Sequence, residues 1–470
     1  MIYLLIIVVY SIAQIALGLW ISQRVRGSKD FFVAGRSLGP GLLFATFLAA
    51  NIGGGSTINA TALGYRDGLA SWWWVGSAGI GSVILAFWVG PRIRQLAADH
   101  DFRTVGDFLE WRYDSRVRAT IAILLWLGTV AILAGQLIGL AVVLSAVIDV
   151  PRWVGCAIGA VVVTAYFSAG GLTSSAVVNV VQLTVKMAGF FIALPLALAT
   201  VGGMSGLHAA VPDPAMWSGW QNGSSGWMYV AMLTPAFVVS PGLLQKVYGA
   251  RDARTVRIGV GLNAFALLVY AAIPALLGMI ARVHHPGLST ADLALPTLFS
   301  HDVPFWVGGL GLAAVFSAEV SAADAILFML ATSLSQDLYK RFVAPDATDR
   351  QVLRVARMAS VAGGVLGIVV ALWAQTIVTA LSIFYTLLGV SLFVPVLAGL
   401  YMARPRAGDA LAAITAGVAA VVVAQFWNGG KPIGVFTPAM CGLSAAIVVF
   451  ALAVFLIPRS PSTVPARAGR

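Results

Sequence analysis

The sequence predicts an all-α polytopic membrane protein with about thirteen transmembrane helices. The chain of 470 residues is 59% hydrophobic and only 10% charged, and its mean hydropathy is +0.91. Soluble domains are about 45–50% apolar and about 25% charged. The apolar residues form long runs without polar alternation, which favours helices over a membrane barrel. This composition excludes a soluble globular enzyme and a disordered chain.

Thirteen segments are apolar enough to cross a bilayer, which takes about 20 residues of helix. The first segment has no preceding basic region and no small-residue cleavage motif, so we expect a retained span rather than a cleaved signal. Short loops join most segments. The expected spans are residues 2–22, 39–59, 69–91, 119–148, 152–169, 174–200, 226–245, 255–281, 304–335, 355–374, 376–402, 408–427 and 433–457.

The basic residues are concentrated in alternate loops of this layout. Together, the loop after the first span and every second loop that follows it carry 24 of the 29 Lys and Arg residues. The loops between them carry four. Cytoplasmic loops are enriched in Lys and Arg. We therefore expect a plasma (inner) membrane protein with its N-terminus outside and its C-terminus in the cytoplasm. No basic cluster with interleaved aromatics predicts a nucleic-acid partner. The remaining basic residue, Lys186, lies inside the sixth span.

The second span contains three consecutive glycines, residues 53–55, between polar side chains. Each glycine costs a helix about 1 kcal/mol relative to alanine, so this run predicts a broken helix. Unwound carbonyls can hold a cation, and half-helix ends can meet a solute. Close packing through small residues is the alternative. Asn51, Ser56 and Thr57, which flank the glycines, are candidate solute-binding residues.

The sixth and ninth spans also carry polar residues deep in the membrane, where such groups point to function. Asn179 and Lys186 share one face of the sixth span. In the ninth span Ser321 and Asp324 share a face, whereas Glu319 lies about 160° around the helix from Ser321. Each of the two acids is a candidate partner for Lys186 or a proton carrier. A buried structural ion pair is the alternative.

Two further residues are candidates for the solute site. Gln136 is a lone polar residue in the fourth span, where helix–helix hydrogen bonding is its other role. Trp74 lies near the expected outer end of the third span, where tryptophans typically form an interfacial belt. The sequence contains no Walker A, GxSxG or HExxH motif. We therefore expect no enzyme.

Five stretches, in order, resemble the sodium:solute symporter family. They are DFFVAGRSLG, AANIGGGSTINATALGYRDGL, GGLTSSAVVNVVQ, SPGLLQKVYGARDAR and SAEVSAADAILFMLATSLSQDLYKRF, and they lie within residues 28–402. The resemblance implies a LeuT-type fold with five-plus-five inverted repeats, and import of a small polar solute by alternating access. It divides the chain into the first span and loop (1–38), a transport core (39–402, with repeats 39–200 and 226–402), two C-terminal spans (403–457) and a cytoplasmic tail (458–470).

The resemblance also implies where a coupling sodium ion would bind. The family's shared site uses carbonyls of the broken span and the ninth span together with two hydroxyls. Carried over by motif, the carbonyls belong to Ala49, Ile52 and Ala318, and one hydroxyl belongs to Ser321. No other metal or cofactor is implied.

The sequence departs from the family pattern at this site. Ala322 stands where the family has the second hydroxyl, and Asn179 stands where it has an aspartate. Two hypotheses therefore remain open: ordinary sodium symport, and sodium-independent transport, either proton-coupled or facilitated, with Lys186 at the degenerate site. A solute-sensing membrane module without net transport is a third. Sugar-transporting relatives carry a Glu-Gln pair where this chain has Gly55 and Ser56, which makes hexoses less favoured.

Overall fold

The computed structural model describes residues 2–22, 33–148, 150–167, 171–220, 226–374, 376–427, 429–433 and 436–455. Within these ranges the chain consists of helices and their connections, with two isolated β-bridges. The expected tail 458–470 and residues 23–32 of the expected first loop lie outside the described residues. The predicted all-α fold class is confirmed.

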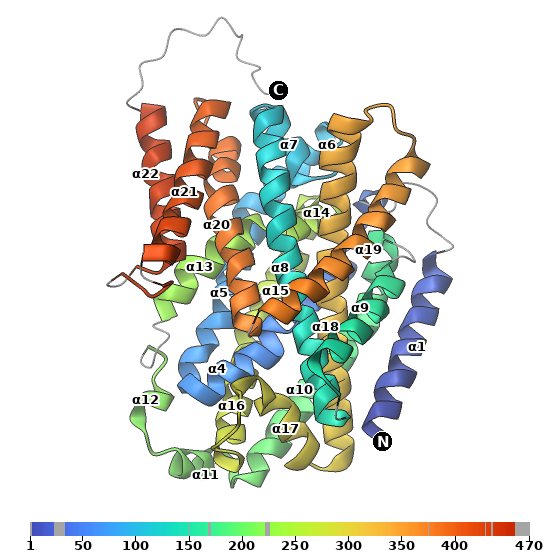
Figure 1. Cartoon of the computed structure of the whole chain (residues 1–470), viewed down its shortest axis with the longest axis vertical. Helices are drawn as coiled ribbons and strands as arrows, with labels where there is room; N and C mark the ends of the chain where they lie inside the picture. The colour runs from blue at the N-terminus through green and yellow to red at the C-terminus, as the bar shows by residue number, and fades with distance from the viewer. Residues whose placement is uncertain are drawn as a thin grey trace, which may run out of the picture.

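Most of the longer helices run roughly along the long axis of the molecule (Figure 1). Short 3-10 or π-helical stretches adjoin or interrupt several of them. The helices are α1 (Ile2–Ser22), η1 (Ala34–Arg36), α3 (Pro40–Asn51), η2 (Gly55–Asn59), α4 (Ala60–Asp67), η3 (Gly68–Ser71), α5 (Trp72–Ile84), η4 (Leu85–Val89), α6 (Gly90–Asp99), α7 (Val105–Arg112), α8 (Ser115–Val147), α9 (Arg152–Phe167), α10 (Gly171–Thr200), α11 (Gly203–Ala210), α12 (Pro214–Trp217), α13 (Gly226–Val239), α14 (Pro241–Gly249), α15 (Ala253–Tyr270), α16 (Ala272–His284), η5 (Ala291–Leu293), α17 (Ala294–His301), α18 (Phe305–Thr332), η6 (Ser333–Val343), α19 (Asp349–Trp373), α20 (Ile377–Tyr401), α21 (Ala407–Trp427) and α22 (Pro438–Phe455).

Ten helical stretches within the described ranges are long and apolar enough to cross a membrane. Three shorter apolar stretches, Ile2–Gly18, Pro40–Asn51 and Arg152–Thr164, do not reach the required length. The expected number of thirteen spans is therefore not confirmed by length and hydropathy. The stretch Pro40–Asn51 is short because its helix is interrupted where the glycines begin.

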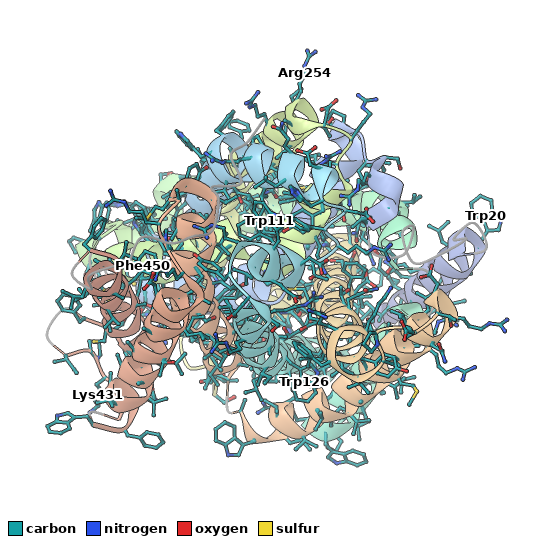
Figure 2. The ribbon with its side chains drawn as sticks, turned by 90° about the horizontal axis from the view of Figure 1, so that it is seen from above. Trp20, Trp111, Trp126, Arg254, Lys431 and Phe450 are labelled. Carbon is teal, nitrogen blue, oxygen red and sulfur yellow. The ribbon has the colours of Figure 1, made fainter. Side chains whose placement is uncertain are left out.

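The helices that carry the polar residues form the centre of the bundle. Helix α10 packs against α18 and α3, and α8 packs against α18 and α20. Viewed from above, Trp20 of α1 lies at one edge of the molecule, and Phe450 of α22 and Lys431 lie toward the opposite edge (Figure 2). The first helix and the last two therefore flank the part that holds the candidate site.

Two of the central helices are broken. The first break follows Asn51, because Ile52 leaves the helical conformation and the chain resumes as a π-helical turn at Gly55. The second lies at Ser240, between α13 and α14, and was not predicted. Pro241 opens α14 at the position where a proline does least harm, since its missing N–H has no helical partner there. The predicted break in the second span is confirmed.

A cluster of charges joins α7, α8 and η6 at one end of the bundle. The guanidinium of Arg118 lies 2.9 Å from Asp107, 2.8 Å from Glu110 and 2.8 Å from Asp337. Arg341 also pairs with Glu110, at 2.5 Å. The side chains of Arg118 and Asp337 are 7% and 4% exposed, so the bond between them is shielded from water, whereas Arg341 is exposed. In the sequence Arg118 is one basic residue of the loop before the expected fourth span, but in the fold it joins three helices.

Candidate functional site

The first break leaves backbone groups that side chains must satisfy, since a buried unpaired peptide group costs free energy. The hydroxyl of Thr57 donates to the carbonyl of Gly53 at 2.9 Å, and that of Ser56 donates to Asn51 O at 2.8 Å. The N–H of Gly54 donates to Gln136 Oε1 at 2.9 Å. The polar residues around the glycines therefore hold the break open in a fixed shape.

The ammonium of Lys186 lies at the end of α3. Its Nζ donates to Ala49 O at 2.7 Å, to Ile52 O at 3.0 Å and to Ser321 Oγ at 2.5 Å. All three acceptors belong to the expected sodium ligand set. The carbonyl of Ala318, the fourth member, accepts from Ser321 Oγ at 3.0 Å instead. Lys186 is fully buried, and its three ammonium donors are matched by three acceptors.

Each of the two deep acids interacts electrostatically with a different lysine. The charge of Glu319 acts on Lys186, and the charge of Asp324 acts on Lys246. Both acids are buried. Of the two candidate partners, Glu319 is therefore the one whose charge favours the charged form of Lys186. The offset of Glu319 from Ser321 does not separate it from Lys186, because the lysine comes from another helix.

The carboxylate of Glu319 is enclosed by backbone. A Cβ on Gly54 or on Gly139 would lie 2.6 Å from its nearest carboxylate oxygen. Both oxygens lack a well-formed hydrogen bond within the described part of the chain, and the adjacent N–H of Gly54 donates to Gln136. Glu319 is therefore a buried acid with a cationic neighbour and little hydrogen bonding.

Asn179 bonds to helix α3. Its side-chain amide donates to Thr46 Oγ1 at 3.1 Å, and Lys246 Nζ donates to Thr46 O at 2.9 Å. Lys246 is 2% exposed. The expected seventh span, residues 226–245, would leave Lys246 in the following loop, whereas the structure has it inside α14. Because Ser240 only interrupts the helix, the chain continues through α14 to Gly249 and carries Lys246 into the interior.

A cavity lies beside the first break. Its space free of protein atoms is about 800 Å³, including the part that is open to solvent. Four of the five expected solute-binding residues line it: Asn51, Ser56, Trp74 and Gln136. Thr57 is not among the lining residues. Its side chain is buried against the break that it stabilises through Gly53.

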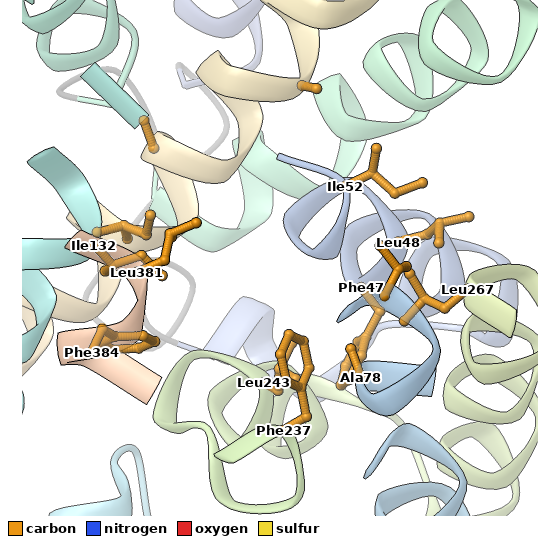
Figure 3. Close-up of a cluster of buried hydrophobic side chains, with 14 of the residues drawn as sticks. Phe47, Leu48, Ile52, Ala78, Ile132, Phe237, Leu243, Leu267, Leu381 and Phe384 are labelled. Carbon is orange, nitrogen blue, oxygen red and sulfur yellow. The ribbon is translucent and has the colours of Figure 1, made fainter. Parts of the chain in front are cut away.

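Sequence reasoning missed most of the opposite wall. It comes largely from α13, α14, α18 and α20, and Figure 3 shows Phe237, Leu243, Phe384 and Ile132 around this region. The tryptophan run did carry a signal, since Trp74 lies edge-on to Tyr229 and Tyr385 beside the cavity instead of in an interfacial belt. For α13 and α14, the signal was the Ser240–Pro241 step, which marks a second break.

Comparisons with known proteins agree with this architecture. A family model, the sodium:solute symporter family, matches residues 31–417. The sodium/glucose cotransporter of Vibrio parahaemolyticus is 25% identical over 78% of this chain and 74% of that protein. The sodium/pantothenate symporter of Escherichia coli is 27% identical over 83% of each. The solved structure of a Na⁺-coupled sialic acid symporter aligns with a TM-score of 0.82 at 18% identity, over 97% of this chain and 98% of that one.

Proposed function

Because the chain belongs to the sodium:solute symporter family, it is a secondary active transporter that imports a solute, and we propose that Lys186 replaces sodium in its cycle. The chain is an integral membrane protein with the LeuT-type fold. The observation that carries the proposal is the position of the Lys186 ammonium on Ala49 O, Ile52 O and Ser321 Oγ. A tethered cation there supplies the charge that an ion would otherwise bring.

The donor set around Lys186 does not fit sodium well. A small hard cation takes about six oxygens and benefits from anionic ligands. Position 322 is an alanine and offers no hydroxyl, and the amide of Asn179 bonds to Thr46. The carbonyls of Ala49 and Ile52 and the hydroxyl of Ser321 already accept hydrogen bonds from the ammonium. Sodium symport, the default of the family, requires Lys186 to leave this position.

Glu319 favours the proton as the coupling ion. It is buried beside the break, its charge acts on Lys186, and its oxygens have little hydrogen bonding. A proton gained by this pair changes its net charge by one without any ligand entering. Facilitated transport, without a coupled ion, is the simpler form of the same proposal, and Glu319→Gln distinguishes the two. Proton-driven accumulation requires the titratable acid, whereas facilitated exchange does not.

We extend the proposal to the division of the chain. Residues 39–402 form the transport unit, with repeats 39–200 and 226–402. In support, the two breaks, after Asn51 and at Ser240, fall in the first crossing helix of each half. We also place the protein in the plasma (inner) membrane with its N-terminus outside.

Sodium binding to the purified protein tests the proposal directly. We expect the melting temperature of the wild type to be the same in sodium chloride and in N-methylglucamine chloride of equal ionic strength. The triple variant Lys186→Ala, Asn179→Asp, Ala322→Ser restores the family's ligands, so sodium should stabilise it. Lys340→Ala, a change far from the break, is the matched control. Sodium-dependent stabilisation of the wild type would overturn the proposal.

Transport in proteoliposomes tests the coupling itself. A pH gradient, acid outside, should drive accumulation in the absence of sodium, and Glu319→Gln should reduce this to equilibration. If a sodium gradient alone drives accumulation and Lys186→Ala leaves it unchanged, the lysine has no coupling role. Binding of a solute without any uptake would instead indicate a sensing module.

A further inference from the structure

The cavity beside the first break has a lysine in its wall, and we propose that Lys246 recognises the carboxylate of a small organic acid with a compact apolar body. This inference rests on the proposed transport function and names the class of solute. The two relatives described above are named for glucose and for pantothenate, so their names do not decide the class. The chemistry of the cavity wall does.

Lys246 is the one formally charged residue on the described wall of the cavity. The structure records one hydrogen bond from its Nζ, to Thr46 O. An ammonium has three donors, so the recorded bond leaves capacity for a ligand. Asp324 acts electrostatically on Lys246 but does not line the cavity. Of these two charged residues, only Lys246 lines the cavity.

Three uncharged polar residues of the wall already bond to protein through one group each, whereas no bond within the described residues is recorded for the side chains of Ser240 and Tyr385, which also line the cavity. Asn51 Nδ2 donates to Asn263 Oδ1 at 3.1 Å, and Ser56 Oγ donates to the backbone of Asn51. Gln136 Oε1 accepts from Gly54 N. Each polar group of a solute that is left unpaired here costs about 1–3 kcal/mol. These uncharged groups can serve a neutral or a charged solute, so the charge of Lys246 decides the class.

The remaining wall is apolar or aromatic. Phe237, Leu243, Phe384 and Ile132 line it (Figure 3). Aromatic faces also attract quaternary ammonium groups. Such a cation would meet the charge of Lys246, and the described wall itself carries no acid that would attract it. An anion with an apolar body satisfies both the lysine and the aromatic side chains.

Matched pairs of an acid and its primary amide test this inference on the purified full-length protein. The probes are propionate and propionamide, L-lactate and L-lactamide, and benzoate and benzamide, with glucose and choline as other classes. We expect at least one carboxylate to bind at least about tenfold more tightly than its amide, which corresponds to about 1.4 kcal/mol. Equal binding of acid and amide, or binding of glucose or choline but no carboxylate, would overturn the inference.

Variants then assign the preference to Lys246. Lys246→Met should abolish the difference between acid and amide, Lys246→Arg should retain it, and Lys340→Met should leave it unchanged. If Lys246→Met does not fold, Asp324→Asn provides an alternative test. It removes the neighbouring acid and keeps the ammonium, so the preference should persist or increase, and its loss would contradict the inference.

Running each titration in sodium chloride and in N-methylglucamine chloride separates the two proposals. A carboxylate preference that appears only with sodium would overturn the role of Lys186 and leave Lys246 as the recognition residue. Sodium-independent binding of choline or glucose would overturn the role of Lys246 in recognition and leave the proposed role of Lys186.

Discussion

Two glycines set the shape of the space around Glu319. Gly54 belongs to the broken segment and Gly139 to α8, and neither position has room for a methyl group beside the carboxylate. In the sequence, only the first was visible as part of an unusual run. Gly139 lies in an ordinary apolar stretch, and nothing local marks it. Its importance arises because an acid from another helix points at it.

Replacing either glycine by alanine should therefore be costly. In Gly54→Ala and Gly139→Ala the new Cβ would meet the Glu319 carboxylate at 2.6 Å, and overpacking of this kind costs about 1–3 kcal/mol. We expect a lower melting temperature and loss of transport. The control is Gly41→Ala, where no atom lies within 4 Å of the new Cβ. Unchanged stability in both core variants would contradict the packing described here.

A substitution of Thr57 separates two possible roles, stabilising the helix break and binding the solute. Thr57→Val removes the hydroxyl that donates to Gly53 O, so stability should fall by about 1 kcal/mol. Solute affinity should change little, because Thr57 does not line the cavity. Chemical or thermal unfolding measures the first effect, and equilibrium binding measures the second. A large loss of affinity with unchanged stability would restore Thr57 to the solute site.

Among the elements, the junction of α7, α8 and η6 depends on one side chain. Arg118→Met leaves Asp107, Glu110 and Asp337 without their shared buried cation, and removal of one partner of a buried pair costs about 3–5 kcal/mol. The matched control is Arg116→Met, which breaks the exposed pair with Asp114 and should change stability by less than about 1 kcal/mol. Similar melting temperatures for the two variants would show that the junction does not hold these helices together.

The same junction should weaken in acid. Burial raises the pKa of Glu110, but hydrogen bonds from Arg341 and Arg118 outweigh it, so the pKa lies below its ordinary value. A carboxyl with a lowered pKa contributes stability above its unfolded pKa and loses it as pH falls through the folded one. Melting temperature should therefore decline at acid pH, and Glu110→Gln should reduce the slope. A slope unaffected by the substitution would mean that Glu110 does not contribute.

At this scale, the sequence predicted one helix break and missed the other. The three glycines made the first break predictable, because each glycine destabilises a helix at its own position. The second depends on a single proline after Ser240, and a proline is equally consistent with the end of a span. That ambiguity also hid Lys246, since a helix that ends at Gln245 leaves the next residue in a loop. Tertiary packing, which buries α14, resolves it.

At the scale of the whole molecule, composition and long apolar runs were sufficient for the fold class. The site was partly predictable: the polar residues near the glycines came from the sequence, but the aromatic wall and the pairing of acids with lysines depend on contacts between distant helices. Figure 1 shows α1 beginning and α22 ending at opposite ends of the bundle. This arrangement agrees with termini on opposite sides of the membrane.

Labelling of single cysteines tests the proposed orientation. In a background without Cys156 and Cys441, Ser289→Cys should react with an impermeant maleimide in intact cells. Asp346→Cys should react only after permeabilisation. Both positions are exposed in the fold, so access depends on sidedness. The opposite pattern would invert the topology and show that basic residues such as Arg94 and Arg118, which are buried, serve structure rather than insertion.

The contacts of Lys186 have an energetic consequence for a pump. A sodium ion enters from one side, leaves on the other and dissipates its gradient once per turnover. If Lys186 replaces sodium as proposed, its ammonium, which is attached to α10 and bonds to α3 and α18, returns with the carrier on every cycle. It contributes no stoichiometric driving force. Work on the solute must then come from a proton exchanged at the lysine and its acid, or the protein only equalises the solute across the bilayer and runs in either direction.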